Sequence, residues 1–205
     1  SYQSACATAK TRTRPLPFMS TNRRPRDRWL PHHIIDLNNI SIRYDKFPYP
    51  LYDVHGRLEG VGKKWTYRDL AGKNDTGVVT ASGQLVPAAA GSHLSLQIAG
   101  HNVLLDEELQ NALPAHMRRF WKQLKPQGSI DVAIGLDFES ENKELNLAVT
   151  ADMDGIRVEP TFFPYRMENL RGRVNYQNGR MDFSNLTASH GNLKMAIRRL
   201  GELRN

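Results

Sequence analysis

Histidine and carboxylate side chains are the residues of this sequence that could support catalysis or bind a metal. The seven histidines are scattered, and the one adjacent pair, His32 and His33, has no carboxylate at the spacing that zinc ligands use. Asp106, Glu107 and Glu108 could act as acids or bases, but they also suit the N-cap and first turn of a helix. The sequence contains no Gly-x-Ser-x-Gly motif and no glycine-rich phosphate loop. We therefore expect no catalytic residue, no metal and no cofactor.

Basic side chains, which could bind phosphate groups, gather in two places. Residues 1–36 hold five of the seven net positive charges. This leader could attract nucleic acid or anionic lipid, but its charge and proline content favour a solvated, disordered segment. The second group consists of Arg118, Arg119, Lys122 and Lys125. These cations could contact phospholipid head groups beside Trp121, or they could form a solvated face near a helix C-terminus, which we favour.

The single cysteine, Cys6, excludes an internal disulfide and a cysteine-based metal site. No apolar run reaches the length of about 18 residues that a membrane-spanning helix needs. The chain starts at Ser1, and a strand-like pattern continues almost to its last residue. We interpret the chain as an excerpt of a longer protein, in which any membrane anchor would lie outside these residues.

The sequence contains an internal repeat at an offset of 116 residues. The repeated tripeptide Phe-Pro-Tyr occurs at Phe47, Pro48 and Tyr49 and again at Phe163, Pro164 and Tyr165. The offset holds without a gap from position 47 to 70, and we expect the register to slip downstream because of a longer turn at residues 72–77. Proline cannot donate to a strand ladder, so each tripeptide should form a corner at a break or edge of a sheet, held by its aromatic rings.

Alternation with a period of two predicts an antiparallel sheet. Apolar side chains alternate with polar or small ones in residues 129–139, and the pattern resumes in 145–153 after a short polar loop. Similar alternation in both copies predicts about ten short strands, and one-sided alternation with short loops favours antiparallel pairing. The sequence Gln177-Asn178-Gly179 predicts a tight hairpin turn, because Asn and Gly tolerate positive φ.

One segment has helical spacing instead. Asp106 is the predicted N-cap, Pro114 should divide the segment into two short helices, and Pro126 with Gly128 should end it. The apolar positions are Leu109, Leu113, Met117, Phe120, Trp121 and Leu124. The predicted organisation is a basic, disordered leader (1–35), a first β repeat (36–100), a helical insert (101–128), and a β hairpin with the second β repeat (129–205).

The predicted fold class is mainly β: an antiparallel, curved, elongated open sheet, a repeating β-groove, with one short α-helical hairpin. A hairpin this small cannot cover the apolar face, and exposed apolar surface costs roughly 25 cal/mol per Å². The face must meet another sheet, close on itself, or be covered by something else, such as lipid. The residues predicted to line a lipid groove are Ile130, Val132, Ile134, Leu136, Leu145, Leu147 and Val149. Alternatively, these residues pack under the helices.

The repeat unit resembles the repeating element of the bacterial AsmA-like proteins, a family of repetitive β-groove envelope proteins. The resemblance lies in residues 47–58 and 163–174, and the segment 104–128 is similar to the helical insert of the long planctomycete-type members. It covers about residues 36–200. It implies an elongated β-sheet with an apolar groove, anchored in the inner membrane, extending into the periplasm, and implicated in phospholipid movement toward the outer membrane.

Three functions are compatible with these features. The leading prediction is a non-catalytic groove that shields phospholipid acyl chains, with neighbouring repeats of the same longer chain as further partners. The alternative is a structural or protein-interaction scaffold within a large repetitive envelope protein. A nucleic-acid binder ranks last, since the basic residues concentrate outside the predicted sheet.

Overall fold

The computed structural model describes residues 10–12, 30–162 and 165–204, with the backbone alone for 10–12 and 197–204. The described strands form one sheet in which each strand pairs antiparallel with the next along the chain. These strands are β1 (Lys10–Arg12), β2 (His32–Tyr44), β3 (Phe47–Val61), β4 (Lys64–Asn74), β5 (Gly77–Pro87), β6 (Ser92–Leu104), β7 (Ser129–Glu139), β8 (Glu144–Val158), β9 (Met167–Gln177), β10 (Arg180–His190) and β11 (Leu193–Arg204). Two helices, α1 (Glu107–Ala112) and α2 (Ala115–Leu124), connect β6 to β7.

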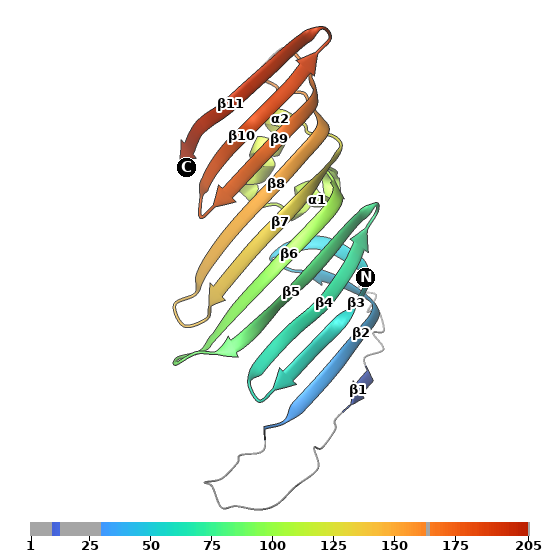
Figure 1. Cartoon of the computed structure of the whole chain (residues 1–205), viewed down its shortest axis with the longest axis vertical. Coiled ribbons are helices and arrows are strands. Elements are labelled where there is room, and N and C mark those ends of the chain that lie inside the picture. Colours follow the sequence, from blue (N-terminus) through green and yellow to red (C-terminus); the bar gives the residue numbers. More distant parts are fainter. Residues whose placement is uncertain (1–9, 13–29, 163–164, 205) are drawn as a thin grey trace, which may run out of the picture.

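The sheet is open and elongated, and both helices lie behind it in Figure 1. The predicted fold class, a mainly β antiparallel open sheet with a short helical hairpin, is therefore confirmed. The prediction of short strands is wrong, because the strands from β2 to β11 run for 11 to 15 residues. Strands continue through positions where the alternation breaks, since these positions are bulges rather than ends.

Residues with left-handed backbone conformation cause these bulges. In the first copy they are Asn39 (φ 52°), Asp53 (φ 50°) and Asp69 (φ 51°), and in the second they are Gly155 (φ 84°), Asn169 (φ 51°) and Asn185 (φ 54°). The ladder register shifts beside them, as it does between Tyr67 and Leu70 in β4. Asn, Asp and Gly occupy these positions because they tolerate positive φ better than other residues.

The two copies of the repeat have the same backbone structure. At the offset of 116 residues, β2–β5 correspond to β8–β11, and each bulge of the first copy falls on a bulge of the second. Gly56 and Gly172 share a φ of 139°. A hydrogen bond also recurs: Asn74 Nδ2 donates to Pro50 O at 2.9 Å, and His190 Nδ1 lies 2.8 Å from Arg166 O. The repeat is therefore a structural unit.

The predicted slip in register after position 70 is wrong. Two residues separate β4 from β5, namely Asp75 and Thr76, and two separate β10 from β11, namely Gly191 and Asn192. Asp75 (φ 47°) and Gly191 (φ 56°) both have left-handed backbone conformation. The turns are equally long, but different residues supply the positive φ, which hides the correspondence in the sequence.

The tip of the β2–β3 hairpin crosses behind the sheet (Figure 1). β3 pairs with β4 only from Tyr52 onward, so Phe47, Pro48 and Tyr49 lie where β3 has β2 as its sole neighbour in the sheet of described residues. Tyr49 nevertheless belongs to one buried cluster with Val103 of β6 and Ala112 of α1, although β4 and β5 separate β3 from β6 in the sheet. The hairpin tip must therefore bend over the face, which the bulges in β2 and β3 permit.

Capping side chains and prolines set the helix boundaries as predicted. Asp106 is the N-cap of α1, and its Oδ1 accepts a hydrogen bond of 2.9 Å from Leu109 N. Pro114 is the N-cap of α2, so it separates the helices from the position before α2 begins. α2 ends at Leu124, and Lys125 takes the left-handed conformation. The tight turn at Asn178 and Gly179 is also confirmed, since both residues have positive φ.

The basic leader is described in part. Its residues 10–12 form β1, which pairs with residues 34–36 of β2. β2 begins at His32, which pairs with Val61 of β3. The boundary of the leader therefore lies before residue 32 rather than at 35, and the rest of its positively charged segment lies outside the described residues.

Candidate functional site: the apolar face of the sheet

Register places apolar side chains in rows that cross the sheet on one face. Residues directly opposite each other in neighbouring strands share a face. One row crosses seven strands, from β4 to β10: Leu70, Ala81, Ile98, Ile134, Val149, Tyr176 and Met181. Parallel rows include Leu96, Leu136 and Leu147, and Leu94, Phe138 and Leu145. The rows form a continuous apolar face.

All seven residues predicted to line a groove lie on this face. Within the β7–β8 hairpin, Ile134 pairs with Val149 and Leu136 with Leu147. Ile130 and Val132 pack against the cluster beneath α1, as the alternative interpretation expected. Ile134, Leu136, Leu147 and Val149 are half-buried, and Leu145 is 52 % exposed. Packing near α1 therefore explains why two of the seven residues are apolar. For the other five, a role in lipid binding stays a prediction.

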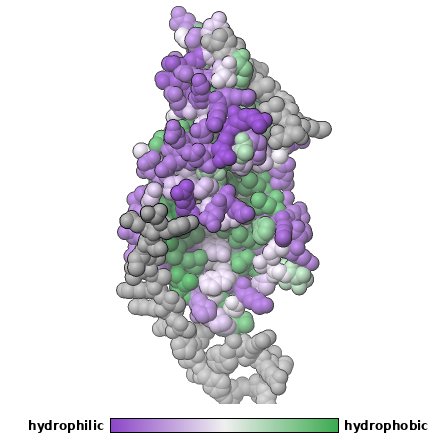
Figure 2. All heavy atoms as spheres, turned by 180° about the vertical axis from the view of Figure 1, so that it is seen from behind, coloured by the Kyte–Doolittle hydropathy of each residue, from purple (hydrophilic) through white to green (hydrophobic). Residues whose placement is uncertain are grey.

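The helices and the folded hairpin tip cover part of the apolar face. Figure 2 views the molecule from the side of the helices, with hydrophilic residues over the upper part and apolar residues gathered over the lower middle. Few side chains on this face are fully buried: among the described residues the buried apolar ones are Tyr49, Val54, Val103, Ala112, Ile156 and Val158. A single-layered sheet with partial cover leaves a broad apolar surface in contact with water.

We define the first corner as Tyr49, Asn74 and Gly77. Buried polar contacts at this corner hold α1 to the sheet. Asn74 is 1 % exposed, and its Nδ2 donates to Pro50 O and to Glu108 Oε2, both at 2.9 Å. Tyr49 is 8 % exposed. Burial, and secondarily the carboxylates of Asp106, Glu108 and Asp75, raises the pKa of Tyr49 to about 12. The raised pKa reflects the burial of Tyr49 in one cluster with Val103 and Ala112.

The corresponding second corner, defined as Tyr165, His190 and Leu193, is far more open. Tyr165 is 52 % exposed and Leu193 is 59 % exposed. The rings of Tyr165 and His190 lie 5.1 Å apart, and Leu193 pairs directly with His190 across the β10–β11 turn. Phe163 and Pro164, the first two residues of the second Phe-Pro-Tyr tripeptide, lie outside the described residues.

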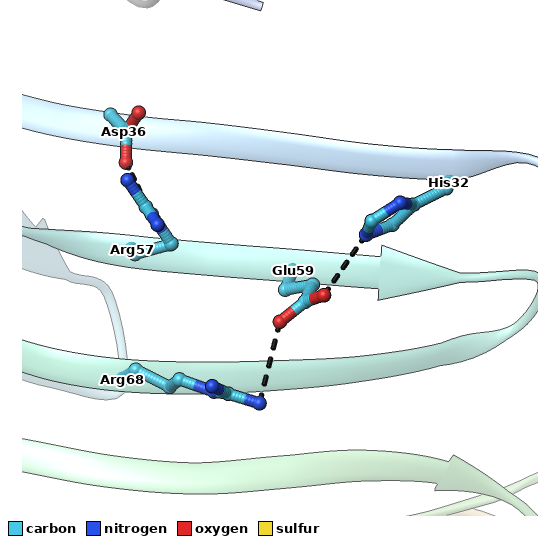
Figure 3. A network of polar contacts seen from close by, with 5 residues as sticks. All are labelled: His32, Asp36, Arg57, Glu59 and Arg68. Carbon is cyan, nitrogen blue, oxygen red and sulfur yellow. Dashed lines mark hydrogen bonds and ion pairs between the residues drawn. The ribbon is translucent and has the colours of Figure 1, made fainter. Parts of the chain in front are cut away.

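The opposite face of the sheet is polar and carries cross-strand ion pairs. Figure 3 shows two neighbouring groups, in which Arg57 binds Asp36 at 2.7 Å and Glu59 contacts both His32 and Arg68. The pair of Arg57 and Asp36 recurs in the second copy as Arg173 and Asp152, at 2.6 Å. Small residues leave a shallow depression of about 490 Å³ on this face, lined by polar side chains such as Gln97 and Gln177. Charges of both signs therefore lie close together on the polar face of the sheet.

The residues weighed for chemistry occupy structural positions. Glu108 binds Asn74, and Asp106 caps α1. His32 pairs with Glu59, and the ring of His33 stacks on Trp65 at 6.3 Å. No group of three or more His, Cys, Asp or Glu side chains that could hold a metal ion occurs in the described part of the chain. None of the helices in that part is long and apolar enough to cross a membrane.

The basic group of α2 lies at the surface. Arg118, Arg119, Lys122 and Lys125 are exposed, while Trp121 is half-buried. Arg118 Nη1 donates to Asn111 O at 3.3 Å, and Lys122 lies in the last turn of the helix, where a cation interacts favourably with the helix dipole. This placement suits a solvated face, and it also leaves these side chains accessible to an anionic group.

Comparison with known proteins finds no family model, no curated protein and no solved structure that matches this chain. The class of structure is defined by the fold itself: an open antiparallel meander with one apolar face, one polar face and a short pair of helices over part of the apolar side.

Proposed function

We propose that this chain is a non-catalytic β-groove module of a bacterial envelope protein, which shields phospholipid acyl chains during transport between membranes or outer-membrane assembly. The observation that carries the proposal is the row of apolar side chains across seven strands, on a face that the helices and the hairpin tip cover only in part. An acyl chain lying along these rows gains about 0.8 kcal/mol for each CH₂ group it removes from water. Head groups would remain at the rim, in water.

The resemblance to AsmA-like proteins supports the same function. That resemblance implies an elongated open sheet with an apolar groove, and the observed fold is a mainly β, antiparallel open sheet with one apolar face. A periplasmic location, with an inner-membrane anchor outside these residues, belongs to the proposal. The structural repeat suits a scaffold of stacked units equally well, so the decisive experiment must measure bound lipid.

The test is the lipid content of the chain after purification without detergent. Mass spectrometry of an extract should find phospholipid in stoichiometric amount. Ile134→Asp should remove most of it, because a carboxylate in the middle of the apolar row makes burial of an acyl chain costly. Ala133→Asp is the matched control: Ala133 is exposed on the opposite face of the same strand, so lipid content should not change.

A second variant guards against loss of the fold in Ile134→Asp. Leu145 is already 52 % exposed, so Leu145→Asp should leave the thermal midpoint nearly unchanged while lowering lipid content. A lipid-free parent chain that also excludes a fluorescent fatty acid would favour the scaffold. Unchanged lipid uptake in both folded variants would also contradict the groove.

A further inference from the structure

The helix α2 has an apolar side and a basic side, but none of its side chains is buried. The apolar residues recur at helical spacing and are half-buried: Met117, Trp121 and Leu124. The basic residues on the opposite side are exposed: Arg118, Arg119 and Lys122. Phe120 lies at the border between the two sides and is 37 % exposed. The apolar side of α2 is therefore covered only in part.

Backbone hydrogen bonds from another part of the chain fix the end of α2. Thr161 N donates to Gln123 O, and Glu159 N donates to Leu124 O, both at 2.8 Å. These bonds satisfy two carbonyl groups that have no partner within the helix. Phe162 follows Thr161 directly and is 70 % exposed. The same bonds therefore place an exposed aromatic residue beside the last turn of α2.

The positive charge of α2 is not balanced by carboxylates. Residues 109–130 contain no Asp or Glu but four Lys and Arg side chains: Arg118, Arg119, Lys122 and Lys125. None of these four forms an ion pair with another described residue. Glu159, whose backbone bonds to the end of α2, has its carboxylate paired with Arg166. The four cations are therefore available to a negatively charged partner.

We propose that the α2 surface, defined as these four cations with Phe120 and Phe162, binds the surface of a bilayer that contains anionic phospholipid. The cations attract the lipid phosphates, and the two exposed rings enter the boundary between head groups and acyl chains. A partner that offers phosphate alone would match the cations but leave the rings in water. The inference goes beyond the proposed function, because a chain that shields no acyl chain can bind a bilayer in the same way.

The test is flotation of the full chain with vesicles of equal parts phosphatidylglycerol and phosphatidylcholine, beside vesicles of phosphatidylcholine alone. The chain should float with the anionic vesicles only, and added salt should weaken the binding because it screens the attraction. Each Lys or Arg close to an anionic surface strengthens binding by about fivefold. Arg118→Gln combined with Lys122→Gln should therefore lower the affinity by at least about tenfold.

Arg57→Gln combined with Arg173→Gln is the matched control for charge. It removes the same net charge, but from exposed ion pairs on the polar face, so the affinity should change little. Both double variants keep the basic leader, so any attraction due to the leader is common to them. Equal losses in the two variants would overturn the proposal, since net charge would then explain the binding.

A single substitution tests the aromatic part of the surface. Phe162→Ser should lower the affinity for anionic vesicles several-fold and leave the thermal midpoint nearly unchanged, since most of this side chain is already in water. Leu145→Ser is the matched control, because Leu145 is also exposed but lies in the β7–β8 hairpin, so vesicle binding should stay the same. Leu145 belongs to the proposed groove, so lipid content and vesicle binding can fail independently.

Three further results would contradict bilayer binding through α2. The first is a parent chain that floats with neither kind of vesicle, or equally with both. The second is unchanged vesicle binding in Phe162→Ser, since charge alone would then be sufficient. The third is tighter binding of the parent to a duplex DNA fragment than to the anionic vesicles, which would assign the cations to nucleic acid.

Discussion

The two copies of the repeat agree in their backbone and differ in burial. The bulges, the glycine pair Gly56 and Gly172, and one cross-strand ion pair recur at corresponding positions. Tyr49 is nevertheless buried under α1, while Tyr165 is half exposed. The repeated sequence therefore specifies a conformation, and the neighbouring elements decide whether that conformation acquires a core.

This difference separates two sources of stability in an extended sheet. Hydrogen bonds between consecutive strands, and residues that tolerate positive φ at the bulges, depend only on nearby parts of the chain. Both copies have them. Burial of large side chains requires an element from elsewhere in the chain, and only the first corner has one among the described residues. Matched substitutions in the two copies can measure each source separately.

The largest expected effect comes from truncating the corner tyrosines. Tyr49→Ala removes a buried aromatic ring and should lower the free energy of unfolding by about 3 kcal/mol or more. Tyr165→Ala should lower it by about 1 kcal/mol or less, because half of that ring is already in water. Denaturant unfolding of the two variants beside the parent measures both values. Equal losses would show that α1 does not make the first corner more stable than the second.

Alternation in the sequence was sufficient to predict the sheet and the apolar face. It carried no information on which residues of that face are buried by other elements. Ile130 and Leu145 have the same pattern in the sequence, yet Ile130 packs under the α1 cluster and Leu145 is half exposed. The reason is physical: a period of two specifies the face of a strand, whereas cover depends on contacts between distant elements. The helix caps were predictable because Asp106 acts on its own turn.

The folded hairpin tip could not be predicted for a related reason. The bulges of this tip lie at Asn39 and Asp53, residue types that are also common in turns, so their presence in the sequence does not indicate a long bent strand. The cluster of Tyr49, Val103 and Ala112 joins elements that are not neighbours in the sheet, so no local pattern indicates it. Only the tripeptide at position 47 gave a signal, because its proline, Pro48, pointed to an edge.

An intermediate loss of stability, equal in the two copies, is expected from substitution of the corresponding glycines Gly56 and Gly172. A Cβ on Gly56 would lie 2.7 Å from Asp69 O, and one on Gly172 would lie 2.9 Å from Asn185 O, both at a φ of 139°. Gly56→Ala and Gly172→Ala should therefore each lower the free energy of unfolding by about 2 kcal/mol.

Gly179→Ala is the control for this comparison, because it has a positive φ but no atom within 4 Å of the added Cβ. It should cost less than either bulge glycine, since only the backbone conformation is strained. A loss at Gly56 that clearly exceeds the loss at Gly172 would mean that the cover over the first copy also restricts its backbone.

The smallest effect is expected from the repeated ion pair. Arg57 with Asp36 and Arg173 with Asp152 are held at 2.7 and 2.6 Å, but about half of each side chain is exposed, so solvent and salt screen the attraction. Arg57→Ala and Arg173→Ala should shift the thermal midpoint slightly and equally, and the shift should shrink as salt is added. A large, salt-independent loss in either variant would contradict this. Since such a pair adds little stability, its recurrence is better explained by register: opposite charges facing each other across two strands favour the alignment that turns the apolar side chains to the same face.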